Sequence, residues 1–149
     1  MSTAIQLPFR CSRRVEFADT DAAGIVHFSS YFRYMEFAEA AFFRRLGWPL
    51  LEQRDDGAYG FPRIHTEARY KAPLFFEDEV HIELNIQTLE HSRIHYEFSF
   101  EKAVAGSHLT VATGTMRVVY VKRGTDLAKL VPVDIPPSWR NQLQALITQ

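Results

Sequence analysis

The sequence is poor in cysteine, in blocks of like charge and in long apolar runs. Its single cysteine, Cys11, cannot form a disulfide within the chain, which is typical of a protein that works in a reducing cytoplasm. Cys11 stands in a strand-like stretch between charged residues with no histidine close by, so we do not expect it to be a nucleophile. The first ten residues have no basic start followed by a long apolar run, and no stretch approaches the length of a membrane span. These absences predict a cytoplasmic protein without a membrane partner.

The formal net charge of −1 argues against the class of general polyanion binders. Lysine and arginine are scattered along the chain, whereas nucleic-acid-binding surfaces are usually basic stripes. No nucleic-acid partner is therefore expected. The length of 149 residues is enough to bury a core and fits one domain, residues 1–149.

One stretch has helical periodicity and is unusually apolar. After the turn residues from Asp19 to Gly24, Ser29 or Ser30 can cap a helix that ends at Gly47. Glu36 stands within this helix, where a carboxylate needs a partner or a proton. A surface helix keeps one polar face, so an apolar surround predicts that other elements enclose it. The apolar residues that extend almost all the way round are Tyr31, Phe32, Tyr34, Met35, Phe37, Ala38, Phe42, Phe43 and Leu46.

Most of the remaining chain has the period of two that is typical of strands. A first strand is predicted over Cys11 to Phe17, and a looser segment with turn residues follows the helix. A short C-terminal helix is expected over Trp139 to Ile147. Short connections between alternating strands favour an antiparallel sheet with one solvent-exposed face and one buried apolar face. The alternating strands are predicted over residues 62–71, 79–86, 93–100 and 109–121.

The faces of these elements favour one architecture. A sheet with one dry face and a helix that is apolar on nearly every side are both buried when the sheet rolls around the helix. The sequence therefore predicts an α+β fold, with an antiparallel sheet of about five strands wrapped around one long central helix. The last strand is apolar on both faces from Val118 to Val121, which suggests burial against another subunit. We therefore expect a homo-oligomer, a dimer or a tetramer.

Asp21 precedes the apolar helix, where free backbone N–H groups and the positive end of the helix dipole converge. A carboxylate in this place can do chemistry on a carbonyl group. Aspartate is also common in turns, so spacing alone favours an ordinary turn residue. Asp19 is the expected structural acid of the turn. Two carboxylates two residues apart do not make a metal cage by themselves, so no metal site is expected.

The turn, the helix and a later motif resemble the 4-hydroxybenzoyl-CoA thioesterase family. They are also similar to its YbgC-like acyl-CoA thioesterase branch and to the 1,4-dihydroxy-2-naphthoyl-CoA thioesterases. The resemblance covers nearly the whole chain and implies a hotdog fold and hydrolysis of an acyl-CoA. The residues that carry it are Asp19-Thr20-Asp21-Ala22-Ala23-Gly24-Ile25-Val26, then Tyr31, Glu36, Ala38, Leu46-Gly47, and Tyr70-x-x-Pro73 with Asp78.

The resemblance also implies roles for residues at matching positions. Asp21 matches the catalytic aspartate, and Phe28 falls where the family uses a backbone N–H at the helix start to polarise the thioester carbonyl. Gly24 would let the backbone turn through positive φ and approach the thioester. Tyr31 is a candidate either for substrate contact or for the core. His27 stands one position before the usual histidine of the YbgC-like branch, so a catalytic and a structural role both stay open.

The basic cluster that handles CoA phosphates in the benzoyl branch is reduced here to a short segment. Ser92 and Arg93 are the candidates for contact with CoA, and a solvated Arg93 is the simpler alternative. In the pattern of the resembled family, an arginine is common at the position that Glu39 occupies here. CoA enters as part of the substrate, so no separate cofactor is expected. The sequence leaves the acyl group open.

Thioester hydrolysis needs a nucleophile, or a base that activates water, and a donor for the oxyanion. Asp21 can attack the carbonyl to give a mixed anhydride or can deprotonate water, while backbone N–H groups between Gly24 and Phe28 stabilise the negative charge. The alternative is a non-catalytic hotdog domain that binds acyl thioesters or acts as an assembly module. A hotdog dehydratase is disfavoured because no His-Phe-Pro-Gly motif is present.

Overall fold

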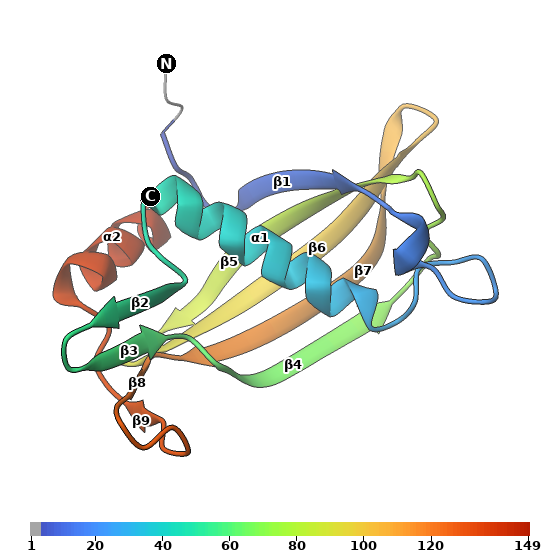
Figure 1. Cartoon of the computed structure of the whole chain (residues 1–149). Helices are drawn as coiled ribbons and strands as arrows, with labels where there is room; N and C mark the ends of the chain where they lie inside the picture. Colours follow the sequence, from blue (N-terminus) through green and yellow to red (C-terminus); the bar gives the residue numbers. More distant parts are fainter. Residues whose placement is uncertain (1–3) are drawn as a thin grey trace.

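The computed structural model describes residues 4–149, which form two antiparallel sheets and two helices (Figure 1). The larger sheet contains, in spatial order, β1 (Phe9–Arg14), β5 (Glu79–Leu89), β6 (Arg93–Val104), β7 (Ser107–Val119) and β4 (Arg63–Tyr70). The smaller sheet contains β2 (Leu51–Arg54), β3 (Gly57–Gly60), β8 (Val121–Arg123) and β9 (Val131–Pro132). The helices are α1 (Ser30–Leu46) and α2 (Pro137–Ile147), and a short 3-10 turn, η1, covers Phe17–Asp19.

The long helix α1 lies along one face of the five-stranded sheet (Figure 1). Its fully buried residues include Tyr34, Met35, Ala38, Phe42 and Phe43. The helix ends at Gly47, as predicted, and this residue has the left-handed conformation. The opposite side of α1 stays open to solvent, so the sheet does not enclose the helix completely. The antiparallel sheet and the helix packed on it agree with the sequence prediction. The residues of the sheet that form the core include Val80, Ile82, Leu84, Ile94, Tyr96, Phe98, Phe100, Met116 and Val118.

The strand inventory is larger than predicted. The segment after α1, which we expected to be a loose connection, forms the hairpin of β2 and β3, and the long last strand is divided into β7 and β8 at Tyr120. β2 carries mostly polar, exposed side chains, so its sequence has no apolar alternation to reveal it. The first strand ends at Arg14 instead of continuing to Phe17, because the chain turns into η1 there.

The apolar residues around the end of β7 are buried, but by the chain itself. Tyr120 packs its ring against Phe61 at a centroid distance of 4.8 Å and against Trp139 of α2 at 6.1 Å. Trp139 in turn stacks on Trp48 at 4.5 Å. The chain itself therefore buries these residues, through α2 and Phe61 among others, so their apolar character no longer indicates another subunit. Within residues 4–149, neither helix has the length and apolar character that crossing a membrane requires.

β4 is the strand whose burial departs most from the sequence prediction. Its alternating pattern predicted one dry face, yet Ile64 is 47% exposed and Tyr70 48% exposed. β4 is an outermost strand of the sheet, with β7 on one side and no strand of the described chain on the other. It therefore presents both an open hydrogen-bonding edge and exposed apolar side chains.

The side chain of Met35 in α1 packs directly on Gly114 of β7. A Cβ added at this position would overlap the end of the Met35 side chain and lie 2.7 Å from the backbone oxygen of Glu67. Contacts of that length do not occur in relaxed structures, so any larger residue would push the helix or β4 away. Glycine is therefore required here both by the backbone of the neighbouring strand β4 and by the Met35 side chain of α1.

We expect Gly114→Ala to lower the free energy of unfolding by about 1–3 kcal/mol, because overpacking a tight core forces neighbouring atoms to shift. Chemical denaturation followed by circular dichroism would measure this. Gly124→Ala is the matched control, since a Cβ at Gly124 meets nothing within 4 Å. Equal stability of the two variants would show that the helix does not need this close approach.

Candidate functional site

The Asp-containing turn folds back on itself directly before α1. The Asp21 N–H donates to the Ile25 oxygen at 2.8 Å, and the His27 N–H donates to the Asp19 oxygen at 2.8 Å. Gly24 has φ of 83°, the positive value predicted for it, and its N–H donates to the Asp21 oxygen at 3.0 Å. The turn is thus a small two-stranded loop that leads into the helix start.

Asp19 ties this loop to the helix. Its buried Oδ2 accepts hydrogen bonds from the Glu16 N–H at 2.9 Å and from the Tyr34 hydroxyl at 3.1 Å, and Arg13 Nη2 lies 3.8 Å away. Its backbone oxygen accepts from the Ser30 hydroxyl at 2.9 Å. These contacts agree with the structural role expected of Asp19. Burial, together with the neighbouring Asp19 charge, raises the pKa of Tyr34, so its hydroxyl stays protonated and donates.

Asp21 combines features of both roles considered for it. Its Oδ1 accepts the Ala23 N–H at 2.8 Å, which is the hydrogen bond of a turn aspartate. Its Oδ2 makes no hydrogen bond within residues 4–149. One carboxylate oxygen therefore fixes the side chain, and the other is available to a ligand.

The five backbone N–H groups from Gly24 to Phe28 differ in whether they are already used. Those of Gly24, Val26 and His27 donate to backbone oxygens within the fold. The N–H groups of Ile25 and Phe28 make no hydrogen bond within the described residues 4–149, and that of Phe28 is the nearer to the helix. It lies two residues before the first helical residue, Ser30, near the positive end of the helix dipole. Phe28 thus offers a free donor at the position where the family resemblance implies an oxyanion contact.

The helix start is not capped in the expected way. Ser29 is at the N-cap position but makes no side-chain capping bond. Its hydroxyl lies 2.7 Å from Nδ1 of His27, and its N–H donates to the same nitrogen at 3.2 Å. A nitrogen that accepts a backbone N–H carries no proton, so the proton of the neutral imidazole is on Nε2. His27 is therefore oriented to donate through Nε2.

The aromatic side chains at this end of α1 divide into exposed and buried ones. Phe28 is 62% exposed, and its ring lies 4.3 Å from that of His27. Tyr31 is buried among Tyr34, Tyr70 and Phe100, which favours its core role, and burial raises the pKa of its hydroxyl to about 12. The exposed Phe28 is the better candidate for ligand contact.

Ser92 and Arg93 lie at the other end of the sheet. Arg93 begins β6, whereas Phe100, seven residues later on the same strand, contacts Tyr31 at the start of α1. At about 3.3 Å per residue the separation along the strand is roughly 20 Å. Arg93 lines a small groove of about 180 Å³ with His95 and Arg117. Sequence reasoning missed Arg117, which the pairing of β6 with β7 places opposite His95.

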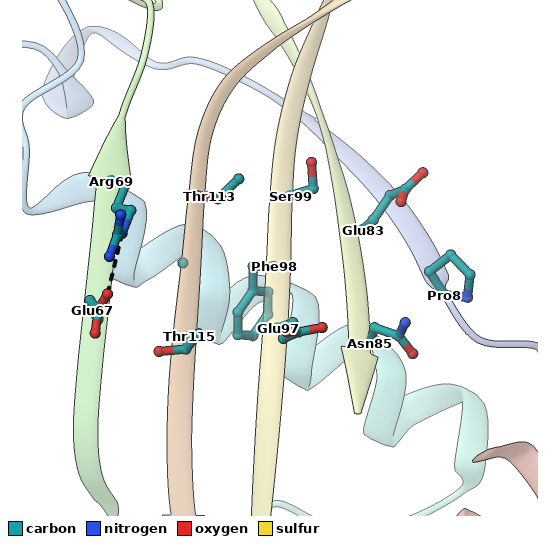
Figure 2. A pocket seen from close by; sticks show the side chains of 11 residues that line it. Pro8, Glu67, Arg69, Glu83, Asn85, Glu97, Phe98, Ser99, Thr113 and Thr115 are labelled. Carbon is teal, nitrogen blue, oxygen red and sulfur yellow. Dashed lines mark ion pairs between the residues drawn. The ribbon is translucent and has the colours of Figure 1, made fainter. Parts of the chain in front are cut away.

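A larger groove, of about 370 Å³, lies on the face of the sheet opposite α1 (Figure 2). Short polar side chains such as Ser99, Thr113 and Thr115 form its floor, and Glu67 pairs with Arg69 at 3.5 Å along one wall. It contains none of the residues predicted for the site.

In the described part of the chain, no group of three or more His, Cys, Asp or Glu side chains could hold a metal ion.

The carboxylate that α1 buries is Glu39 and not Glu36. Glu36 was expected to need a partner within an apolar helix, but its side chain is 70% exposed. Glu39 is fully buried, and its Oε1 accepts from Arg63 Nη2 at 2.6 Å. Its Oε2 and the buried Tyr96 hydroxyl have no partner within residues 4–149. Burial raises the pKa of Glu39 from its ordinary value of 4.5 to about 7, against the opposing effect of the Arg63 charge.

A helix laid on an antiparallel sheet, with a carboxylate turn at the helix start, agrees with the hotdog thioesterase fold that the sequence resemblance implies. Comparison of the sequence with family models agrees, since the model described as the Thioesterase-like superfamily matches residues 15–143. The chain belongs to this superfamily. The family resemblance and the enzyme class predicted from the sequence are thereby confirmed.

Individual relatives support the same assignment. A protein of Aquifex aeolicus is 37% identical over 118 residues, which are 79% of this chain and 88% of that protein. A 1,4-dihydroxy-2-naphthoyl-CoA hydrolase of Synechococcus elongatus is 31% identical over 106 residues, 70% of this chain and 75% of the other. The solved structure of a gentisyl-coenzyme A thioesterase superposes with a TM-score of 0.71 and 32% identity, covering 88% of this chain and 98% of that one.

The raised pKa of Glu39 predicts how stability depends on pH. The folded state retains this proton up to about pH 7, whereas the unfolded state loses it near pH 4.5, so the free energy of unfolding falls as the pH rises between these values. At about 1.4 kcal/mol per pKa unit, the loss is up to about 3 kcal/mol.

Denaturation at pH 4.5 and at pH 8 would measure the free energy of unfolding of the wild type and of Glu39→Gln. Because the glutamine side chain cannot ionise, the free energy of unfolding of this variant should not fall between the two pH values. Glu36→Gln is the matched control on the same helix, where the side chain is exposed and the decrease should persist. If the free energy of unfolding of Glu39→Gln fell as much as that of the wild type between the two pH values, the pH dependence would come from other groups.

Proposed function

We propose that this protein is an acyl-CoA thioesterase whose site lies between Asp21 and the start of α1. The observation that carries the proposal is the Phe28 N–H, which is unbonded within residues 4–149 and follows directly on the loop that holds the carboxylate. Membership in the Thioesterase-like superfamily supports it, as do relatives that are named for hydrolysis of CoA thioesters.

The reaction starts when the thioester oxygen accepts a hydrogen bond from the Phe28 N–H, which stabilises the negative charge that develops there. Asp21 then acts through its unbonded Oδ2. In one route the carboxylate attacks the carbonyl carbon, the C–S bond breaks, CoA leaves as the thiolate, and water hydrolyses the resulting anhydride. In the other route Oδ2 takes a proton from a water molecule that attacks the same carbon, the C–S bond then breaks, and CoA leaves as the thiol with that proton.

His27 has a supporting role in this proposal. Because Nδ1 is occupied by Ser29, the neutral ring has only the Nε2 proton to offer. His27 is then a hydrogen-bond donor that orients the thioester or the attacking water, and it is not the base. The exposed Phe28 ring beside it contacts the acyl group, which we expect to be apolar.

We further propose that the active unit is a homodimer formed by the open edges of β4. A two-fold axis that pairs β4 antiparallel with its copy places the Arg63 end of one strand beside the Tyr70 end of the other. The exposed Ile64 and Tyr70 side chains and the unpaired edge support this pairing. The pairing also brings the end of the partner that carries Arg93 toward the site, so CoA phosphates are bound across the subunit boundary.

We expect Asp21→Asn to reduce turnover of an acyl-CoA by roughly 100-fold or more, because the amide can neither attack nor accept a proton. A thiol-release assay over aromatic, short-chain and long-chain acyl-CoAs would measure this and identify the acyl group. Asp126→Asn is the matched control, since Asp126 Oδ1 also accepts an N–H two residues on, that of Ala128, at 3.1 Å. Undiminished turnover in Asp21→Asn would remove Asp21 from the mechanism.

The second candidate, a non-catalytic domain that binds acyl thioesters, is favoured by the displaced position of His27 relative to the YbgC-like pattern. Calorimetry with the same panel separates the two functions. Heat of binding without release of free thiol would favour the binding domain, and thiol release by the wild type would exclude it.

The dimer proposal predicts that Ile64→Glu converts the protein to the monomer, because like charges then face each other near the paired edges. Light scattering after size exclusion would measure the mass, and hydrolysis should fall with it. Val104→Glu, at an exposed position in the hairpin of β6 and β7, should leave the mass unchanged. A monomeric wild type with full activity would contradict the pairing.

A further inference from the structure

Tyr70, the last residue of β4, reaches across to the start of α1. Its hydroxyl donates to the backbone oxygen of Phe28 at 2.8 Å, a contact between residues 42 apart in the sequence. Its ring meets that of Tyr31 edge-on at 5.1 Å, which fixes the direction of the side chain. The strand at the edge of the sheet is thereby bonded to the peptide that follows the free Phe28 N–H.

This hydrogen bond restrains a residue that packing leaves loose. The Phe28 side chain is 62% exposed, and its N–H has no partner within residues 4–149. The Phe28 N–H shares a planar peptide group with the His27 oxygen, which accepts from the Ser30 N–H at 2.9 Å, and the His27 N–H donates to the Asp19 oxygen. The next peptide group, which contains the Phe28 carbonyl, is held by Tyr70, so this hydroxyl restrains residue 28 from its other side.

We propose that Tyr70 is a positioning residue that aims the Phe28 N–H at the thioester oxygen. The inference rests on the proposed function and adds to it a residue that does not touch the reacting atoms. A donor must lie within about 2.7–3.1 Å of the oxyanion to be effective, so a small rotation of residue 28 weakens it.

The chemistry of Tyr70 agrees with positioning rather than with proton transfer. Burial raises the pKa of its hydroxyl above the ordinary value, so the group remains protonated near neutral pH and acts as a donor. Its only hydrogen bond within residues 4–149 goes to a backbone oxygen. A base, by contrast, would have to lose this proton and with it the bond to Phe28.

The test is Tyr70→Phe, which removes the hydroxyl and keeps the ring that packs on Tyr31. We expect kcat for the best acyl-CoA to fall about 10-fold or more, toward the 10²–10³-fold loss that follows removal of a whole oxyanion donor. KM should stay within about twofold, and the fall should be equal at every pH from 6 to 9. If the hydroxyl had a purely structural role, Tyr70→Phe would lower the unfolding midpoint but would not lower kcat at a nearly unchanged KM.

Tyr120→Phe is the matched control, because it removes a hydroxyl whose partner, Arg54 at 3.4 Å, belongs to the smaller sheet. It should leave kcat and KM at wild-type values. Unchanged kcat in Tyr70→Phe, a rise in KM alone, or the loss of one limb of the pH profile would each overturn the positioning role.

Failure of the proposed function has a different signature. A wild type that releases no thiol from any acyl-CoA, or an Asp21→Asn variant with full turnover, would remove the reaction and the role of Tyr70 with it. An active wild type, an inactive Asp21→Asn variant and a fully active Tyr70→Phe variant would overturn the role of Tyr70 alone.

Discussion

The close packing of α1 against the middle of the five-stranded sheet is the constraint on which the rest of the structure depends. Gly114 permits it, because the end of Met35 occupies the space that a side chain on β7 would fill. The helix start is then fixed at the Tyr70 end of β4, and Glu39 is carried into the interior beside Arg63. A helix displaced by one side-chain thickness would lose both arrangements.

The loop before α1 is held by buried hydrogen bonds, and this leaves its outer atoms free for a ligand. Asp19 accepts from Glu16, Tyr34, His27 and Ser30, so the loop cannot rotate away from the helix. Within residues 4–149, Oδ2 of Asp21 and the N–H of Phe28 remain unbonded. Rigid support next to reactive groups is what catalysis by preorganised dipoles requires.

The sequence predicted the long helix, its end at Gly47 and the strands of the larger sheet, because their apolar periods extend over many residues. It failed for the smaller sheet, whose strands have two to four residues and too little alternation to detect. It also failed for the apolar residues from Val118 to Val121. Burial was recognised there, but residues of the same chain supply it, with Trp139 of α2 against Tyr120.

What the sequence by itself determined is local: the turn with Asp21, the positive φ of Gly24 and the helix that starts after Phe28. Tertiary structure decided which backbone N–H stays free, that Tyr70 holds the carbonyl of Phe28, and that Glu39 is buried while Glu36 is exposed. These outcomes depend on contacts between residues that are dozens of positions apart. A pattern along the chain reports which face of an element is apolar, whereas only the packed fold determines what lies against that face.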